Sequence, residues 1–432
     1  MYETVQVNFT SVDDLPFYDP KQYQVTVDTS DKEIAEPVAD QLLMIKTEPL
    51  SRYKWGGSFN LSTNFLGYAS VRLKMTSRSK SDKDSYSDVW LSNPVSIAVS
   101  RKMRVIDHVF TWSVAVLVAI IFVNFGCALD WPLLRKTLCR PIGPMIGFIS
   151  QFLFMPLISY FLAKLLFPYS VAMQLGLFFT GVAPGGGASN VWIYLLGGNL
   201  NLSISMTAIS TLAAFFMIPC WTFTLGRLIF DEGRIAIPYS RIASVAVALV
   251  IPLTVGFILQ KKAPKVSQFL VRILKHFSAC LILFIIIFAI ITNFYLFKLF
   301  TWEIIVAGLG LPWLGYIFGY LLAKIFNQPP EDQLAISIET GIQNTGIAIF
   351  MLRFALGQPE ADLTTVVPVA VAVMTPFPLM AWYLIQKFQK RHKQQKKGLP
   401  VATSEDVLNN CVNQPLNGHI KYNGDIKNVD KF

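Results

Sequence analysis

Apolar residues dominate residues 106–388, whereas residues 1–105 and 389–432 are mostly polar. The central region contains about nine apolar runs that are long enough to cross the hydrocarbon core of a bilayer. They lie near 107–128, 141–163, 171–196, 202–226, 239–259, 276–297, 303–325, 334–356 and 364–386. So many long runs argue against a soluble fold. We therefore predict an all-α polytopic membrane protein in residues 106–388.

The N-terminal region, residues 1–105, has a different pattern. Short alternating runs are separated by Gly, Pro, Ser and Asp, which is typical of a small antiparallel sandwich. These runs are YQVTVDT, GSFNLST, YASVRLKM and PVSIAVS. Asn8 and Asn60 begin glycosylation sequons, so we expect a glycoprotein if this domain enters the secretory lumen. The start of the chain does not read as a signal peptide, which favours either an upstream start or a domain that stays inside.

The distribution of charged residues indicates how the chain is oriented across the membrane. Only 15% of the residues are charged, and the formal net charge is +10. Lys and Arg concentrate in loops of one parity and in the tail, which predicts a lumenal or extracellular N-terminus and a cytoplasmic, disordered tail at 389–432. Arg101, Lys102 and Arg104 oppose this bias. We expect the protein in the plasma membrane or an endomembrane, in contact with lipid. We expect no nucleic-acid partner, and whether the protein forms a homo-oligomer stays open.

A short internal repeat relates the two halves of the membrane region. The sequence YFLAK at 160–164 returns as YLLAK at 320–324, and Thr180-Gly181 returns as Thr340-Gly341, both after a shift of 160 residues. An odd number of predicted spans separates the copies, so they should run in opposite directions. Inverted repeats are typical of secondary transporters, whose binding site lies where the repeats meet.

Two polar breaks interrupt apolar runs: APGGGASN at 183–190 and ETGIQNTG at 339–346. Unwound backbone is tolerated within a membrane only where protein buries it or it lines a cavity. Glu339 is the only acidic residue deep within a predicted span, and a charge there costs roughly 2.5–3.5 kcal/mol. No Lys or Arg is expected at its depth, since Arg353 should snorkel. Its partner is therefore a bound cation, unless Glu339 is protonated or carries protons.

Oxygen-bearing side chains accompany these breaks. Ser203 and Thr207 share one helix face because they are four residues apart. Carboxylate, hydroxyl and amide oxygens suit a hard cation, and a single negative charge favours a monovalent one. The alternatives are a simple Pro-Gly kink at 183–190, helix packing through Ser203 and Thr207, and interhelical hydrogen bonding by Gln151.

Five segments in order resemble the sodium/bile acid cotransporter (bile acid:sodium symporter) family: FVNFGCAL at 122–129, QFLFMP at 151–156, APGGGASN, GNLNLSISMT at 198–207 and ETGIQNTG. The resemblance implies core and panel domains, with two broken helices crossing in the core beside two sodium ions. It implies one sodium site at Ser189, Asn190, Ser203, Thr207 and Glu339, and a second at Gln151, Glu339, Gln343 and the carbonyls of Thr340 and Ile342. Asn344 and Asn190 would face the substrate. The long N-terminal region is more similar to orphan family members with an extracellular extension.

Together these features predict sodium-coupled symport of an organic anion, such as a bile acid or a sulfated steroid, by alternating access. The sequence contains no nucleophile–base set, P-loop or metal cluster, so we do not expect an enzyme. Two alternatives stay open. One is a proton-coupled or uncoupled carrier, and the other is a non-transporting receptor or adaptor that acts through its N-terminal domain.

Overall fold

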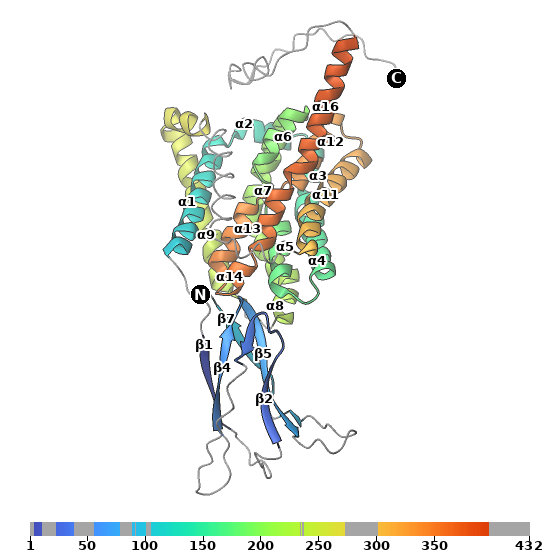
Figure 1. Cartoon of the computed structure of the whole chain (residues 1–432). Coiled ribbons are helices and arrows are strands. Elements are labelled where there is room, and N and C mark those ends of the chain that lie inside the picture. The colour runs from blue at the N-terminus through green and yellow to red at the C-terminus, as the bar shows by residue number, and fades with distance from the viewer. Residues whose placement is uncertain are drawn as a thin grey trace. The chain divides into compact units, whose positions relative to one another are not determined.

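The structure is a computed structural model that describes residues 4–10, 23–38, 56–77, 89–90, 92–100, 105–233, 235, 237–272 and 301–396 (Figure 1). The predicted span near 276–297 and residues 397–432 of the predicted tail lie outside these described residues. The chain divides into two compact units, Met1–Pro376 and Phe377–Phe432.

The helices begin and end close to the predicted apolar runs. They are α1 (Val105–Ala128), α2 (Trp131–Leu138), α3 (Ile142–Ile149), the π-helical segment η1 (Ser150–Phe154), α4 (Met155–Leu166), α5 (Val171–Val182), α6 (Ala188–Leu196), α7 (Leu200–Trp221), the π-helical segment η2 (Thr222–Gly226), α8 (Arg227–Glu232), α9 (Tyr239–Lys262), α11 (Trp302–Ile325), α12 (Pro330–Gly341), α13 (Thr345–Ala355), α14 (Glu360–Leu363), α15 (Val366–Met374) and α16 (Pro376–Lys396). The two runs predicted to contain polar breaks are each divided into a pair of short helices.

Within the described residues, six helical segments are long and apolar enough to cross a membrane. They are Asp107–Ala128, Ile142–Leu166, Leu200–Glu232, Tyr239–Lys262, Trp302–Ile325 and Glu360–Gln389. Two shorter apolar helices, α5 and α13, adjoin the polar breaks. A mostly helical, multi-pass membrane protein is therefore confirmed, whereas the count of nine spans stays a prediction.

The N-terminal region forms two antiparallel sheets. One has the strand order β1 (Thr4–Thr10), β4 (Gly56–Thr63), β3 (Ala35–Pro37). In the other, β5 (Gly67–Ser77) pairs with β2 (Tyr23–Thr29), β6 (Val89–Trp90) and β7 (Val95–Val99). Phe59 and Leu61 of the first sheet and Val71 of the second are buried in one apolar cluster. The four predicted alternating runs are thus strands, and closure into a sandwich stays a prediction.

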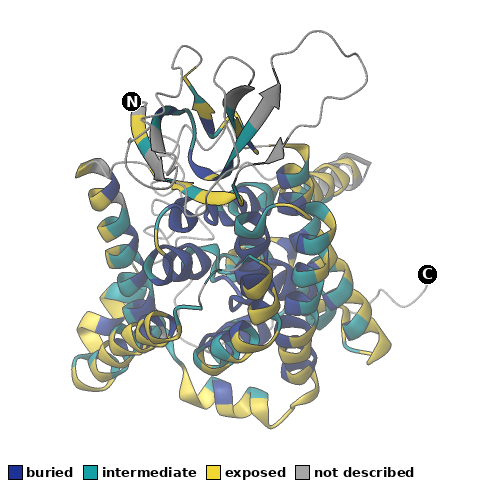
Figure 2. Ribbon diagram, turned by 90° about the horizontal axis from the view of Figure 1, so that it is seen from below, coloured by how far each residue is buried: buried dark blue, intermediate teal, exposed yellow. Residues whose placement is uncertain are grey.

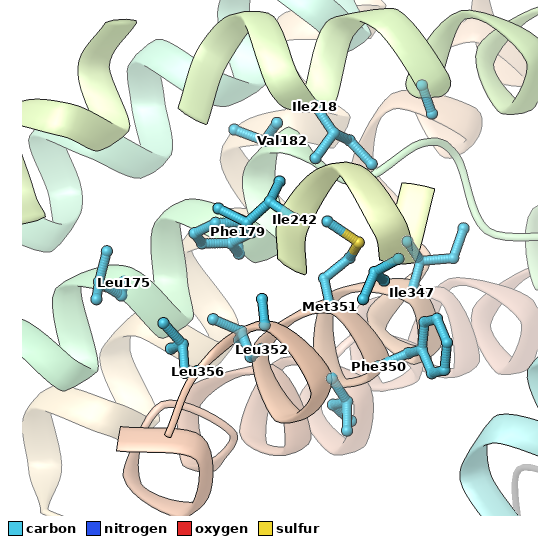
Figure 3. Close-up of a cluster of buried hydrophobic side chains, with 14 of the residues drawn as sticks. Leu175, Phe179, Val182, Ile218, Ile242, Ile347, Phe350, Met351, Leu352 and Leu356 are labelled. Atoms are coloured by element: carbon cyan, nitrogen blue, oxygen red, sulfur yellow. The ribbon is translucent and has the colours of Figure 1, made fainter. Parts of the chain in front are cut away.

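Apolar side chains from both halves of the membrane region form its main core. Figure 3 shows residues of α5, α7, α9 and α13 gathered in one cluster, among them Phe179, Ile218, Ile242 and Met351. Other large apolar side chains, such as Phe216 and Ile251, remain exposed. Figure 2 shows that exposed positions gather on the outer helices and buried ones toward the middle of the bundle. Because lipid tails are as apolar as these side chains, close packing holds the cluster together more than exclusion from water does.

The residues that recur along the sequence also occupy similar surroundings. Lys164 lies 5.9 Å from the ring centre of Tyr160, and Lys324 lies 5.9 Å from that of Tyr320. The two polar breaks meet in an antiparallel bridge between Gly185 and Gln343. The backbones of the two breaks therefore run in opposite directions at this point, and the inverted repeat stays a prediction.

Helices α1 and α9 approach each other closely at two glycines. A Cβ atom on Gly126 would lie 2.2 Å from the carbonyl oxygen of Leu253, and one on Gly256 would lie 2.0 Å from that of Val123. Backbone atoms cannot move aside as side chains do, so any larger residue would push the helices apart.

The Gly256→Ala variant should lower the melting temperature of the purified protein by roughly 5 °C, because overpacking of this kind costs about 1–3 kcal/mol. Gly310→Ala is the matched control, since its added methyl group would lie 3.6 Å from Leu162 Cδ2, an ordinary contact. Tryptophan fluorescence during heating in detergent measures both variants. Equal melting temperatures would show that α1 and α9 do not pack as described.

Candidate functional site

The candidate site lies where the two broken helices meet. Helix α5 ends at Val182 and α6 begins at Ala188, while α12 ends at Gly341 and α13 begins at Thr345. The intervening segments bond to each other: the Gly186 amide donates to the Ile342 carbonyl at 2.8 Å, and the Asn344 amide donates to the Pro184 carbonyl at 2.9 Å. Some of the backbone amide and carbonyl groups that lack a partner within their own helix are thus bonded to the other break.

The sequence explains why the helices stop here. Pro184 has no amide hydrogen, and the glycines that follow it weaken any continuing helix. Gly186 also permits close approach, because a Cβ there would lie 2.9 Å from the carbonyl oxygen of Gln343. In the second break, the Asn344 side chain accepts a hydrogen bond from the Ile347 amide at 3.2 Å and caps the start of α13.

Glu339 lies beside this crossing and is only 2% exposed. Its Oε2 accepts hydrogen bonds from Ser189 at 2.5 Å and Ser203 at 3.0 Å, and its Oε1 accepts one from Thr207 at 2.5 Å. In the described part of the chain, no basic side chain forms an ion pair with it. Neutral hydroxyl donors therefore surround the carboxylate, and its charge is not cancelled by the protein residues described.

Asn190 completes the first predicted set. Its Oδ1 lies 2.8 Å from Ser203 Oγ, whose single hydroxyl hydrogen is shared between Asn190 and Glu339, and its amide nitrogen lies 3.4 Å from Thr207 Oγ1. All five residues of the first predicted sodium site are thus connected around one carboxylate, from α6, α7 and α12. They supply oxygen atoms only, apart from one amide nitrogen, which is the chemistry that hard cations prefer.

Three members of the second predicted set, Gln151, Gln343 and the Thr340 carbonyl, meet beside the crossing. The Gln151 amide nitrogen donates to Gln343 Oε1 at 2.7 Å and to the Ala183 carbonyl at 2.8 Å. The Gln343 amide nitrogen in turn donates to the Thr340 carbonyl at 2.7 Å. Gln151 Oε1 is buried and has no hydrogen-bond partner among the described residues. A buried acceptor without a partner costs free energy, and a cation bound beside Gln151 Oε1 would supply that partner.

A local distortion positions Gln151. It lies on η1, where the helix widens to a π turn just before Pro156. Because Pro156 cannot donate to the Phe152 carbonyl, that carbonyl instead accepts a hydrogen bond from the Trp221 indole at 2.7 Å. Such π segments occur often at functional sites.

The predicted substrate residues are more exposed than the other predicted ion ligands. Glu339, Gln151, Gln343, Ser189, Ser203 and Thr207 are buried, whereas Asn190 and Asn344 are half-buried. The first turns of α6 and α13 begin beside these two asparagines, so both helices direct their positive ends toward the crossing.

Arg353 does not snorkel, so that expectation is wrong. It is only 9% exposed and forms an ion pair with Asp362 of α14 at 3.1 Å. A buried acidic partner on the short helix after α13 removes the need to reach the membrane surface. Asp362 lies 23 positions beyond Glu339, outside the predicted span that contains Glu339 and Arg353. Sequence spacing therefore gave no sign that Arg353 pairs with Asp362.

Sequence reasoning also missed Ser210. It is 6% exposed and lies near Glu339: a Cβ on Gly185 would be 2.7 Å from Glu339 Oε1 and 3.4 Å from Ser210 Oγ. Its spacing from Ser203 and Thr207, seven and three residues, places it on the same helix face and could have revealed it.

Comparison with known proteins gives a consistent result. The Sodium Bile acid symporter family matches residues 115–300. The chain is 34% identical over 268 residues to human P3 protein, which covers 61% of this chain and 56% of that relative. It is 30% identical over 271 residues to the ileal sodium/bile acid cotransporter of Cricetulus griseus, covering 62% of this chain and 77% of the relative. Sodium/bile acid cotransporter 5 of Mus musculus is 28% identical over 267 residues.

The matched segment thus spans a little over half the length of P3 protein and about three quarters of the Cricetulus griseus ileal cotransporter. The family match covers most of α1 and the described elements from α2 to α9. The predicted resemblance is therefore confirmed, and the chain belongs to the sodium bile acid symporter family.

Proposed function

We propose that the protein is a sodium-coupled symporter of an organic anion that works by alternating access. The observation that carries the proposal is the buried Glu339 carboxylate, which three hydroxyl groups surround and which pairs with no basic side chain among the described residues. A small cation bound beside it would cancel the charge. Relatives named as sodium/bile acid cotransporters support sodium as that cation.

Two ions would share Glu339. The first would bind among Ser189, Asn190, Ser203 and Thr207, and the second would bind near Gln151, Gln343 and the carbonyls of Thr340 and Ile342. The unpartnered Gln151 Oε1 supports the second position. Each ion would contact residues from more than one element, so binding would hold the crossing in one arrangement.

The anion would bind at Asn190 and Asn344, in front of the first turns of α6 and α13. Helix N-termini favour negative charge because their amide groups are not all bonded within the helix. The substrate class is an amphipathic anion such as a bile acid or a sulfated steroid. Two sodium ions with one monovalent anion would make transport electrogenic.

The architecture that we propose has nine spans, an inverted repeat with core and panel domains, and an N-terminal β sandwich at 1–105. Residues 106–388 would form the transporter and 389–432 a cytoplasmic tail. The N-terminal domain would face outside or the lumen. Glycosylation at Asn60 and epitope accessibility in intact cells test this orientation.

Proton coupling is the main competing mechanism. Hydroxyl oxygens lie at both carboxylate oxygens of Glu339, so a metal cation would find several oxygen ligands there, whereas a bound proton needs no such set. Uptake of labelled bile acids and sulfated steroids in sodium or choline medium, each at several pH values, distinguishes the two. Uptake that needs a proton gradient and ignores sodium would reject the sodium mechanism.

Replacing Glu339 by glutamine should reduce sodium-dependent uptake at least about tenfold, because the ions lose their only charged ligand. Glu331→Gln is the matched control: it lies in the first turn of the same helix, and its side chain is exposed. Surface biotinylation confirms equal expression. Unchanged transport in Glu339→Gln would remove the basis of the proposal.

Replacing Gln151 by alanine should weaken the second ion and spare the first. We expect the sodium concentration for half-maximal uptake to rise roughly tenfold and the Hill coefficient to fall toward about 1. Gln174→Ala is the matched control, since Gln174 is an equally buried glutamine that bonds to the Phe167 carbonyl, outside the site. Identical sodium dependence in both variants would place the second ion elsewhere.

A further inference from the structure

A small pocket lies between α3, η1 and α7, beside Glu339, with room for about one water molecule or ion. Its lining from α3 and η1 includes Pro144, Gly147, Phe148 and Gln151, and its lining from α7 includes Met206 and Ser210. Neither predicted sodium site includes Ser210 or the apolar members of this lining.

Three oxygen-bearing side chains face this pocket. Gln151 Oε1 has no hydrogen-bond partner in the described chain, although Gln151 is only 3% exposed. Ser210 donates its hydroxyl hydrogen to the Thr207 carbonyl at 3.0 Å, which leaves the oxygen available as an acceptor. Glu339 is the third, and its negative charge makes the pocket attractive to cations rather than anions.

The residues that line the pocket from α3 and η1 lie along one helix face. Pro144, Gly147 and Gln151 are three and four residues apart, so they share one face over roughly 10 Å. Pro144 lies in the first turn of α3, which follows directly on α2. The lining residues thus run from the start of α3, which follows α2, to Gln151.

Met206 forms the narrow wall of the pocket. A Cβ atom on Gly147 would lie 2.1 Å from Met206 Cε and 2.9 Å from its Sδ, so the thioether rests directly on the glycine. Methionine changes conformation easily because its side chain is long and unbranched. A side chain of this kind can open and close a passage without moving the helices.

Resting on the sodium coupling proposed above, we infer that this pocket is the passage by which a sodium ion moves between Glu339 and the α2 end of the bundle. Ser210 is a transit ligand that, with Gln151, replaces part of the ion's water shell. Met206 is the side chain that closes the passage.

The inference is tested with ²²Na⁺ on the purified full-length protein, which requires no transported substrate. In Gly147→Ala the added methyl group displaces Met206 into the pocket, so bound ²²Na⁺ should exchange about tenfold more slowly, with nearly unchanged equilibrium binding. The double variant Gly147→Ala/Met206→Ala should restore the rate. Gly143→Ala is the control, because its methyl group would meet Leu202 Cδ1 at 3.3 Å, outside the pocket.

The outcomes separate the two proposals. Sodium binding by the unmodified protein, with equal exchange rates in Gly147→Ala and Gly143→Ala, would overturn the passage and leave sodium coupling intact. An unmodified protein that binds no ²²Na⁺ would overturn both. Slow exchange in Gly147→Ala that Met206→Ala fails to rescue would indicate a distortion of the helices and would also reject the passage.

A second measurement probes Ser210 directly. Ser210→Cys, in a background with the five native cysteines replaced by serine, should react with a small cationic methanethiosulfonate, and sodium should slow the reaction more than choline does. Ser205→Cys is the control: Ser205 is equally buried on α7 but lies against Thr137. Equal reactivity at the two positions, or no protection by sodium, would exclude Ser210 from the passage.

Discussion

A carboxylate buried in an apolar bundle constrains much of this structure. Glu339 has almost no contact with solvent, so hydrogen-bond donors from other elements must surround it. Ser189 can reach it only because α5 and α6 are separate helices, and Ser203 and Thr207 reach it because one face of α7 carries hydroxyl groups. Gly185 leaves the space that the carboxylate occupies. The break in the first helix and the acid in the second therefore depend on each other.

The crossing also solves a backbone problem. Two interrupted helices within a membrane would leave amide and carbonyl groups without partners, and each such group is expensive in hydrocarbon. Here Gly186 and Asn344 of one break bond to Ile342 and Pro184 of the other. The same arrangement brings the N-termini of α6 and α13 to the crossing, where the side-chain oxygens around Glu339 also lie. A site that could bind a cation and an anion close together thus arises from the way in which the breaks satisfy each other.

Different parts of the site were predictable to different degrees. Ser203 and Thr207 could be paired by helical spacing, and the two breaks could be recognised from Pro, Gly and polar residues within apolar runs. The roles expected of Gln151 and Asn344 came from resemblance to the family. The structure adds that Asn344 starts α13 and that Gln151 keeps one oxygen without a partner. Arg353 was misjudged because its partner, Asp362, lies on a separate short helix.

By itself, the sequence determined that the chain crosses a membrane several times, that an alternating N-terminal region forms strands, and that two related segments carry polar breaks. These properties depend on local composition and periodicity, which the order of residues contains directly. Only the tertiary structure decided that Glu339 meets three hydroxyls from two other helices, that Gln151 meets Gln343, and that Ser210 and Met206 line a pocket beside them. Such contacts join residues up to 192 positions apart, and their distances depend on how whole helices pack against one another.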